Sequence, residues 1–221
     1  TLQLYLNMII LVRKFNDEEV DKLIKFRNSL SDDIKKTRKD NLDKMDDKLP
    51  GIEYIKKELN DLTGIRYILN YLMINHGFRN KDLNLKFVKS LPEDKEENYI
   101  IHKGKNIMLN INDYKTDKSH GTKEIKINDS KFIKEFKSLD LKDGDYILSM
   151  KNGDKINNII TFNDRILKLT IDKLGQNRLV KIVVKDLLNH KSFEKLDQIS
   201  KDRGTSLEVL LKSYNLHNGN D

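Results

Sequence analysis

The chain has 221 residues, of which 42 are Lys or Arg and 35 are Asp or Glu, giving a net charge of +7. The absence of Cys excludes disulfides, thiolate metal ligands and cysteine nucleophiles. The positive balance is compatible with a phosphate-rich partner, and a mixed-charge surface of this kind also serves plain solubility.

Residues 1–48 are predicted to form a helical module. Apolar residues recur at helical spacing in two stretches, 2–15 and 20–26. Residues 29–48 are mostly charged, which predicts a solvated helix or a linker; a basic arm on DNA is the functional alternative. Leu49–Pro50–Gly51 is the strongest break in the chain, and we place a domain boundary there.

The stretch Leu2–Val12 is apolar but shorter than the roughly 18 residues needed to span a bilayer. Gln3 and Asn7 also interrupt it. The core of a signal peptide is the rival interpretation, but no basic segment precedes the stretch and no small-residue cleavage site follows it. We therefore expect no membrane partner and an intracellular location.

Residues 49–221 are predicted to form a mostly helical domain with a small antiparallel sheet. Helical spacing and terminal signals predict helices at 52–62, 65–75, 157–174, 178–189, 192–202 and 205–214. Alternating runs predict strands at 99–101, 107–111 and 125–127. The last two strands flank a polar segment and are expected to pair as an antiparallel hairpin with a long loop. The predicted fold class is therefore α+β.

Several kinds of site are not indicated. The chain has no Gly-rich phosphate loop and no nucleophile elbow, and its five His are not at metal-ligand spacing. We therefore expect no cofactor and no metal. One alternative is a metal-dependent nuclease, in which Glu93 and Asp94, with Glu124 and Lys126 on a strand, would hold Mg²⁺ and activate water. Such short spacings also arise by chance in a chain with 35% charged residues.

Three separated segments carry the residues with chemistry. They are the first box (Gly77–Leu83), the hairpin segment (Asn112–Thr116) and the third box (Arg203–Ser206), with Tyr214 beyond the third box. The first box follows a predicted helix, and the hairpin segment lies at the predicted hairpin loop. Each segment alone is a weak signal, whereas the three in this order make a pattern.

The order and spacing of these segments resemble the catalytic domain of the tyrosine recombinases, the phage-integrase family, over residues 49–217. In that family a Gly-apolar-Arg-x-x-acid-Leu box follows a buried helix, and Arg79 stands at its arginine position. The family's catalytic Lys lies on a β-hairpin, where Lys115 stands here. Its nucleophilic Tyr follows a Gly-His-Ser box by the step that separates Gly204 from Tyr214. The helical module resembles the family's core-binding domain more loosely, and the chain is similar to integrase-like proteins of large DNA viruses.

The resemblance implies that the chain breaks and rejoins DNA through a 3′-phosphotyrosyl intermediate, without metal or ATP. Tyr214 would be the nucleophile, and because a phenol with a pKa near 10 attacks poorly, positive charge must surround the phosphate. Arg79 would hold the nonbridging oxygens through its bidentate fork. Lys115 would donate a proton to the leaving 5′-oxygen, and Asp82 would orient neighbouring groups.

Further positions are assigned by their place in this pattern. Catalytic slots also fall on Arg178, Lys181 and Thr205, and DNA contacts are expected at Lys81, Lys118, Lys123 and Arg203. The expected partners are duplex DNA and further copies of the chain, as a dimer or tetramer on DNA. For a viral protein, the expected location is the host nucleus or a viral factory.

The second box, His-x-x-Arg in the family, departs from the pattern. One alignment puts Arg178 and Lys181 in its two slots, which keeps positive charge; the other puts Asn177 and Val180 there, which removes both groups. Helix periodicity does not decide between them. Thr205 replaces the third-box His, and its hydroxyl can donate a hydrogen bond to phosphate but cannot shuttle protons at neutral pH.

Each site residue also has a structural interpretation. Arg79 can satisfy carbonyls at a helix C-terminus, Lys115 can be a solvated hairpin tip, and Tyr214 can pack its ring at a helix end. Arg178 and Lys181 can be ordinary surface residues. Two functions therefore stay open: an integrase or site-specific recombinase that transfers DNA strands, and a decayed active site retained for DNA binding or assembly.

Overall fold

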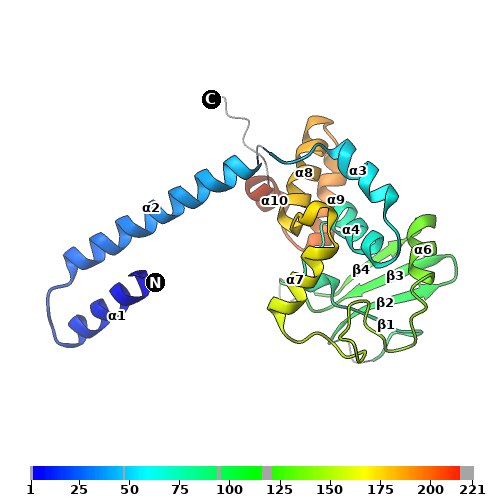
Figure 1. Ribbon diagram of the computed structural model, residues 1–221, viewed down its shortest axis with the longest axis horizontal. Helices are drawn as coiled ribbons and strands as arrows, with labels where there is room; N and C mark the ends of the chain where they lie inside the picture. The colour runs from blue at the N-terminus through cyan, green and yellow to red at the C-terminus, as the bar shows by residue number, and fades with distance from the viewer. Residues whose placement is uncertain (1, 47, 94–95, 116–120, 215–221) are drawn as a thin grey trace. The chain divides into compact units, whose positions relative to one another are not determined.

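The computed structural model describes residues 2–46, 48–93, 96–115 and 121–214, without the side chains of residues 35, 38–46, 213 and 214. The chain divides into two compact units, residues 1–49 and residues 50–221. The first unit is a helical hairpin, and the second unit contains the sheet and the remaining helices (Figure 1).

The first unit consists of α1 (Leu2–Phe15) and α2 (Asp21–Asp46). Leu6 and Ile10 are the buried residues of α1, which packs against α2. The chain reverses between the two helices, where Asp17 takes a positive φ. α2 runs without a break into the charged segment for which the sequence allows either a helix or a linker, so residues 29–46 are helical.

The second unit combines helices with a sheet, which confirms the predicted α+β class. In chain order its elements are α3 (Ile52–Asp61), α4 (Gly64–His76), the 3₁₀ turn η1 (Lys81–Leu83), β1 (Leu85–Phe87), β2 (Asn98–Lys103), β3 (Asn106–Ile111), β4 (Lys123–Ile127), α6 (Ser130–Lys137), α7 (Ile159–Leu169), the 3₁₀ turn η2 (Ile171–Lys173), α8 (Gln176–Asn189), α9 (Phe193–Arg203) and α10 (Leu207–Tyr214). In the part of the chain that the structure describes, no helix is both long enough and apolar enough to cross a bilayer.

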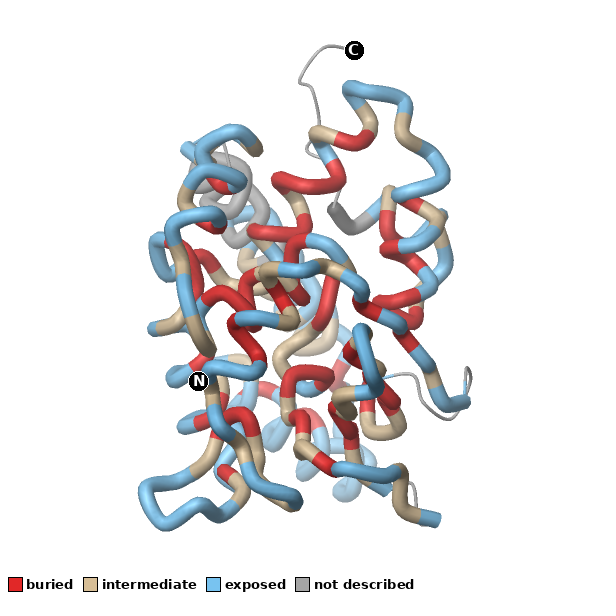
Figure 2. Tube along the Cα trace, turned by 90° about the vertical axis from the view of Figure 1, so that its right-hand side faces the viewer, coloured by how far each residue is buried: buried red, intermediate tan, exposed pale blue. Residues whose placement is uncertain are grey.

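Helix α4 is the centre of the second unit and contacts α3, α6, α7, α8 and α9. Between Tyr67 and Ile74 all of its residues except Tyr71 are buried, because apolar side chains cover most of its circumference. The buried Asn70 amide donates to the carbonyl of Leu169 (3.0 Å) and accepts from the N–H of Ile171 (3.0 Å). In Figure 2 the buried residues are red, and the core residues of the described chain lie in the second unit except for Leu6, Ile10 and Val20.

The sheet has the strand order β1-β2-β3-β4. β3 and β4 pair in antiparallel fashion from Ile107 opposite Ile127 to Ile111 opposite Lys123, which confirms the predicted hairpin. β1 pairs with β2 in parallel, so the sheet is mixed and not purely antiparallel as predicted. The reason is that β2 starts at the same end of the sheet as β1, with Asn98 opposite Leu85.

Helix α6 was not predicted from the sequence, although a signal for it exists. Asp129 caps the helix by accepting a hydrogen bond from the N–H of Phe132 (2.7 Å). Phe132 and Phe136 are then buried one turn apart. An acidic cap followed by two aromatic residues four positions apart is therefore the signature that the prediction missed.

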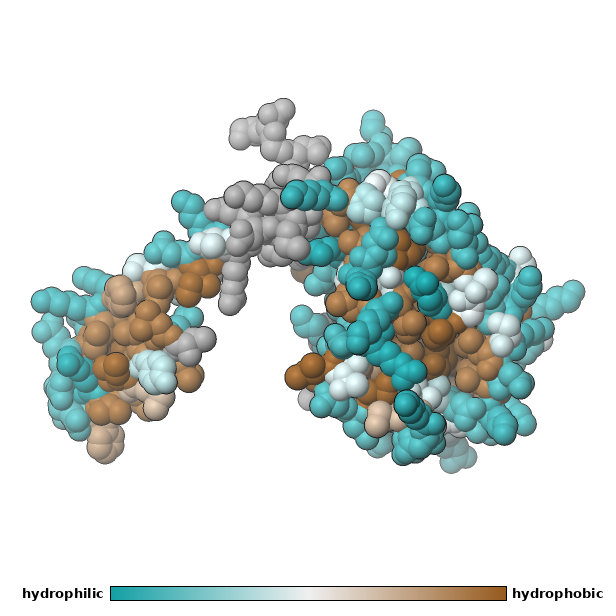
Figure 3. All heavy atoms as spheres, in the orientation of Figure 1, coloured by the Kyte–Doolittle hydropathy of each residue, from teal (hydrophilic) through white to brown (hydrophobic). Residues whose placement is uncertain are grey.

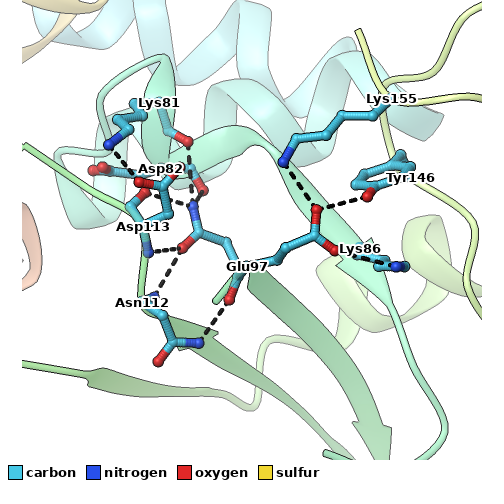
Figure 4. A network of polar contacts seen from close by, with 9 residues as sticks. Lys81, Asp82, Lys86, Glu97, Asn112, Asp113, Tyr146 and Lys155 are labelled. Carbon is cyan, nitrogen blue, oxygen red and sulfur yellow. Dashed lines mark hydrogen bonds and ion pairs between the residues drawn. The ribbon is translucent and has the colours of Figure 1, made fainter. Parts of the chain in front are cut away.

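A polar network around Glu97 joins the start of β2 to β1 and to the segment after residue 144 (Figure 4). One carboxylate oxygen accepts from the Tyr146 hydroxyl (2.7 Å) and the Lys155 ammonium (2.9 Å), and the other accepts from Lys86 (3.1 Å). Burial raises the pKa of Glu97, but the hydrogen bonds from Lys155, Tyr146 and Lys86 outweigh it and lower the pKa to about 2. The folded protein therefore favours the ionised carboxylate.

We predict that this carboxylate makes the folded state sensitive to acid. Because the pKa of Glu97 is lowered on folding, its contribution is complete above an unfolded pKa of about 4.3 and is lost as the pH falls towards 2. Glu97→Gln should lower the free energy of unfolding by about 1–2 kcal/mol at pH 6, discounted for partial exposure, and should have a smaller effect near pH 2.5. Urea unfolding at both pH values measures this difference. Glu53→Gln, at an exposed ion pair with Lys56, is the control and should change little; an equal effect of Glu97→Gln at both pH values would contradict the prediction.

Candidate functional site

The first box begins at the C-terminal end of α4. Gly77 caps the helix in the left-handed conformation, with φ of 63°, which glycine adopts without strain. A Cβ atom at this position would lie 2.9 Å from Cγ2 of Ile199 on α9. The glycine therefore lets the end of α4 approach α9 closely, and the chain then turns to place Arg79 and Asp82.

Asp82 is buried beneath the first box. Its Oδ2 accepts a hydrogen bond from the backbone N–H of Arg79 (2.9 Å), while Oδ1 has no hydrogen-bond partner. Burial raises the pKa of Asp82, and the charges of Lys123, Arg79 and Arg203 oppose this rise. The Asp82 side chain thus holds the backbone of Arg79 and lies close to the charges of Lys123, Arg79 and Arg203.

Two arginines join the first and third boxes by exchanging hydrogen bonds. The guanidinium of Arg203 donates to the carbonyl of Gly77 and to Oδ1 of Asn177 (3.2 Å), and the guanidinium of Arg79 donates to the carbonyl of Arg203. Arg203 is only 1% exposed. The sequence predicts Arg203 as a DNA contact, but its guanidinium lies inside the protein because the carbonyl at the end of α4 needs a donor.

Lys123 is half-buried and, like Arg203, donates to a carbonyl of the protein. Its ammonium donates to the carbonyl of Asp202 (2.7 Å) and lies 3.7 Å from the ring centroid of Tyr114, which is cation–π geometry. Burial lowers the pKa of Lys123 to about 8; Asp82 acts in the opposite direction and Arg79 adds to the lowering. The sequence predicts a DNA contact here, whereas the structure gives this cation partners within the protein.

Asp202 holds α9 against the end of α4. Its Oδ2 lies 2.6 Å from Nδ1 of His76, and its Oδ1 accepts from Gln198 (2.7 Å). The sequence indicates no role for His76 beyond the absence of metal-ligand spacing, and it does not single out Asp202. The two residues are 126 positions apart, so no local spacing could have revealed their contact.

The start of the hairpin segment is fastened to the first box by Asn98 of β2. The Asn98 side chain accepts from the backbone N–H groups of Asn112 (2.8 Å) and Asp113 (2.7 Å) and donates to the carbonyls of Asp113 (2.9 Å) and Lys81 (3.3 Å). Lys81 also forms an ion pair with Asp113 (Figure 4). Lys115 follows and is exposed. Lys118 lies outside the described residues.

Helix α8 provides the second box, and its side chains favour one of the two alignments. Asn177 contacts the guanidinium of Arg203, and Val180 is only 1% exposed and packs in the core. Arg178 and Lys181 are both half-buried. The structure therefore favours the alignment with Asn177 in the first slot of the second box. In that alignment Val180, and not an arginine, occupies the second slot one helical turn later.

The third box ends α9 and starts α10. Gly204 caps α9 with φ of 65°, Thr205 is half-buried, and the hydroxyl of Ser206 accepts from the N–H of Val209 (3.2 Å). Tyr214 is the last residue of α10, and its side chain lies outside the described residues. The structure thus brings the first box, the hairpin segment and the third box together, with Arg79 and Thr205 half-buried at this meeting point.

Among the described residues, no group of three or more His, Asp or Glu side chains is arranged to hold a metal ion. Of the residues considered for a nuclease, Glu124 accepts from the Asn110 side chain (3.2 Å), and Asp94 lies outside the described residues. Comparison of the chain with protein-family models, with curated proteins and with solved structures gave no match.

We predict that Arg203 is a structural residue of the site. Arg203→Met should lower the free energy of unfolding by about 2–4 kcal/mol, because the buried carbonyl of Gly77 loses its charged donor. Lys201→Met, on the same helix and with an exposed ion pair to Asp197, is the matched control and should change it by less than about 0.5 kcal/mol. Chemical denaturation monitored by circular dichroism measures both. Similar small effects of the two substitutions would show that Arg203 does not hold the boxes together.

Proposed function

We propose that this chain binds duplex DNA along its phosphate backbone, with a second unit built like the catalytic domain of a tyrosine recombinase. The observation that supports the proposal best is the meeting of the first box, the hairpin segment and the third box around Arg79. These segments are separated by long stretches of sequence, so their meeting is not a consequence of local structure. They are also the segments that carry phosphate-binding residues in that family.

The positive charge around the meeting point of the three segments supports a polyanionic partner. Lys115 is exposed, and Arg79, Lys123, Arg178 and Lys181 are half-buried around the buried Arg203. The buried charge of Arg203 raises the local electrostatic potential. The more accessible cations around it could then contact phosphate oxygens. Nearly all of the excess positive charge of the chain lies after residue 50. As part of this proposal, copies of the chain associate on DNA as a dimer or tetramer.

Noncovalent binding fits the geometry better than strand transfer. Strand transfer in the family uses two arginines on one phosphate, and the second slot is occupied here by the buried Val180. The loss of one bidentate arginine at a developing charge costs several kcal/mol of transition-state stabilisation, about 10²–10³ in rate. Ground-state binding is less affected, because many phosphate contacts share the binding energy.

Binding to duplex DNA is predicted to depend on salt and on two cations beside the first and third boxes, the exposed Lys115 and the half-buried Arg178. Each of Lys115→Ala and Arg178→Ala should weaken binding and reduce the slope of log K against log salt concentration by about 1, because one counterion fewer is released. Fluorescence anisotropy with a labelled duplex at several salt concentrations measures the slope. Lys137→Ala, an exposed lysine on α6, is the control and should leave it unchanged. Binding without salt dependence, or equal slopes for all three variants, would overturn the proposal.

Strand transfer through Tyr214 is the second candidate function. It is favoured by the hydrogen bond from Arg79 to the carbonyl of Arg203, which lies shortly before Thr205 and α10, the helix that ends at Tyr214. In this reaction the Tyr214 oxygen bonds to phosphorus, the 5′-oxygen leaves, and the leaving group takes up a proton. Arg79 would be the single guanidinium at the phosphate.

If this reaction occurs, duplexes with a 5′-bridging phosphorothiolate should trap a covalent adduct, because the sulfur leaving group does not support rejoining. A denaturation-resistant protein–DNA band should form without added metal, and it should be absent in Tyr214→Phe. The noncovalent function predicts no band while salt-sensitive binding persists on the same duplexes. Cleavage that appears only with Mg²⁺ would contradict both functions and support a nuclease.

A further inference from the structure

Helix α1 exposes far more apolar surface than its packing within the first unit covers. Only Leu6 and Ile10 of α1 are buried. Its other large apolar side chains are 45–89% exposed; they are Leu2, Leu4, Tyr5, Met8, Ile9, Leu11, Val12 and Phe15. A helix that is apolar on nearly all sides is stable in water only when most of its surface is covered. In Figure 3 these residues form much of the hydrophobic surface over α1 and the adjoining part of α2.

The exposed apolar residues form one continuous face. With 3.6 residues per turn, they cover about half of the helix circumference, on the side away from Leu6 and Ile10. Tyr5, Met8 and Val12 line a shallow hollow in the middle of this face, which is bordered by Arg13 and Glu18. We call it the α1 face. It carries no charge before Arg13, so the surface that covers it must itself be apolar.

The size of the α1 face is that of a stable protein interface. Large aliphatic and aromatic side chains have areas of roughly 150–250 Å² each, so the eight residues expose on the order of 1,000 Å². A standard interface takes about 800 Å² from each partner. An isolated hairpin of this length also buries too little surface to be robust on its own, as the few core residues of the first unit indicate.

We propose that the α1 face binds the α1 face of a second copy of the chain, so that two helical hairpins form a four-helix bundle. The described residues of the second unit offer no surface of comparable size, because no element there has more than three exposed large apolar side chains. They are Ile159, Ile160 and Leu167 on α7, and Tyr54, Met150, Phe193 and Val209 elsewhere. A second α1 supplies an uncharged apolar face of equal size. A membrane surface fits less well, because Arg13 and Lys14 are the only cations of α1, and interfacial helices have basic polar faces.

Charge also fixes the direction of packing. The cations Arg13 and Lys14 lie in the last turn of α1. Antiparallel packing about a two-fold axis keeps these cations in the two copies apart by about the length of the helix, roughly 20 Å. Parallel packing would bring four positive charges together. The antiparallel arrangement places the middle of α1, near Met8, against its own equivalent.

The first test measures the mass of the full chain in solution, without DNA, by sedimentation equilibrium over a range of concentrations. The wild type should be a dimer. Leu11→Lys should raise the dimer dissociation constant by at least tenfold, because a charge is buried in the interface. Phe193→Lys, a comparably exposed apolar residue on α9, should leave it unchanged. Leu11 is exposed and not buried in the hairpin, so circular dichroism should show retained helix.

Other occupants of the α1 face give results that overturn the proposal. A monomer at all concentrations, destabilised by Leu11→Lys, would mean that the second unit of the same chain covers the face. Co-sedimentation of a monomeric chain with anionic phospholipid vesicles would indicate a membrane surface. A dimer that tolerates Leu11→Lys would use another surface. None of these results depends on DNA binding, so this proposal and the proposed function fail separately.

The direction of packing is tested by single cysteines, since the chain has none of its own. Under oxidation by diamide, Met8→Cys should form a disulfide-linked dimer, because antiparallel packing brings residue 8 near its equivalent. Leu2→Cys, at the end of the same helix, should not. Efficient cross-linking of Leu2→Cys but not of Met8→Cys would contradict antiparallel packing.

Discussion

Two hydrogen bonds, from Arg79 to the carbonyl of Arg203 and from Arg203 to the carbonyl of Gly77, are the constraint on which the rest of the candidate site depends. Two helices, α4 and α9, end side by side in left-handed glycines, and each end exposes carbonyls that its own helix does not satisfy. Each arginine supplies the donor for the opposite end. A buried guanidinium is costly unless hydrogen bonds compensate for its desolvation, and that of Arg203 donates to the carbonyl of Gly77 and to Oδ1 of Asn177. These hydrogen bonds therefore fix which ends of α4 and α9 lie together, in addition to the packing between the two helices.

The same constraint explains why the positive charges divide into two groups. Arg203 and Lys123 satisfy carbonyls inside the protein, where Asp82 and Asp202 balance them. Lys115 is exposed and Arg178 is half-buried. A site for one phosphate in a transition state concentrates guanidinium groups on a single point, whereas this arrangement spreads accessible cations around a buried core of charge. Such a spread suits a polymer of phosphates better than a single reacting one.

The sequence predicts elements of this structure better than it predicts side-chain partners. The helices around α4 and the hairpin of β3 and β4 follow from periodicity, because each carries its apolar pattern within one segment. The parallel pairing of β1 was not predicted, because a strand of three residues is too short to show an alternating apolar pattern. The pattern of the first box indicated Arg79 as a site residue. The burial of Arg203 was not predicted, because nothing in the neighbouring sequence distinguishes this arginine from one on the surface. The contact of His76 with Asp202 depends on tertiary structure alone.

The assembly of the site from distant segments links ligand binding to folding. Residues near 80, 113, 123, 177 and 203 meet only when the second unit is closed from α4 to α9. A partly unfolded chain, in which α9 has separated from α4, loses the site entirely. A ligand held there therefore favours the closed unit by mass action, by about 2.7 kcal/mol at a concentration a hundred times its dissociation constant. The unit would consequently be more resistant to proteolysis and to heat when occupied, without any change of shape.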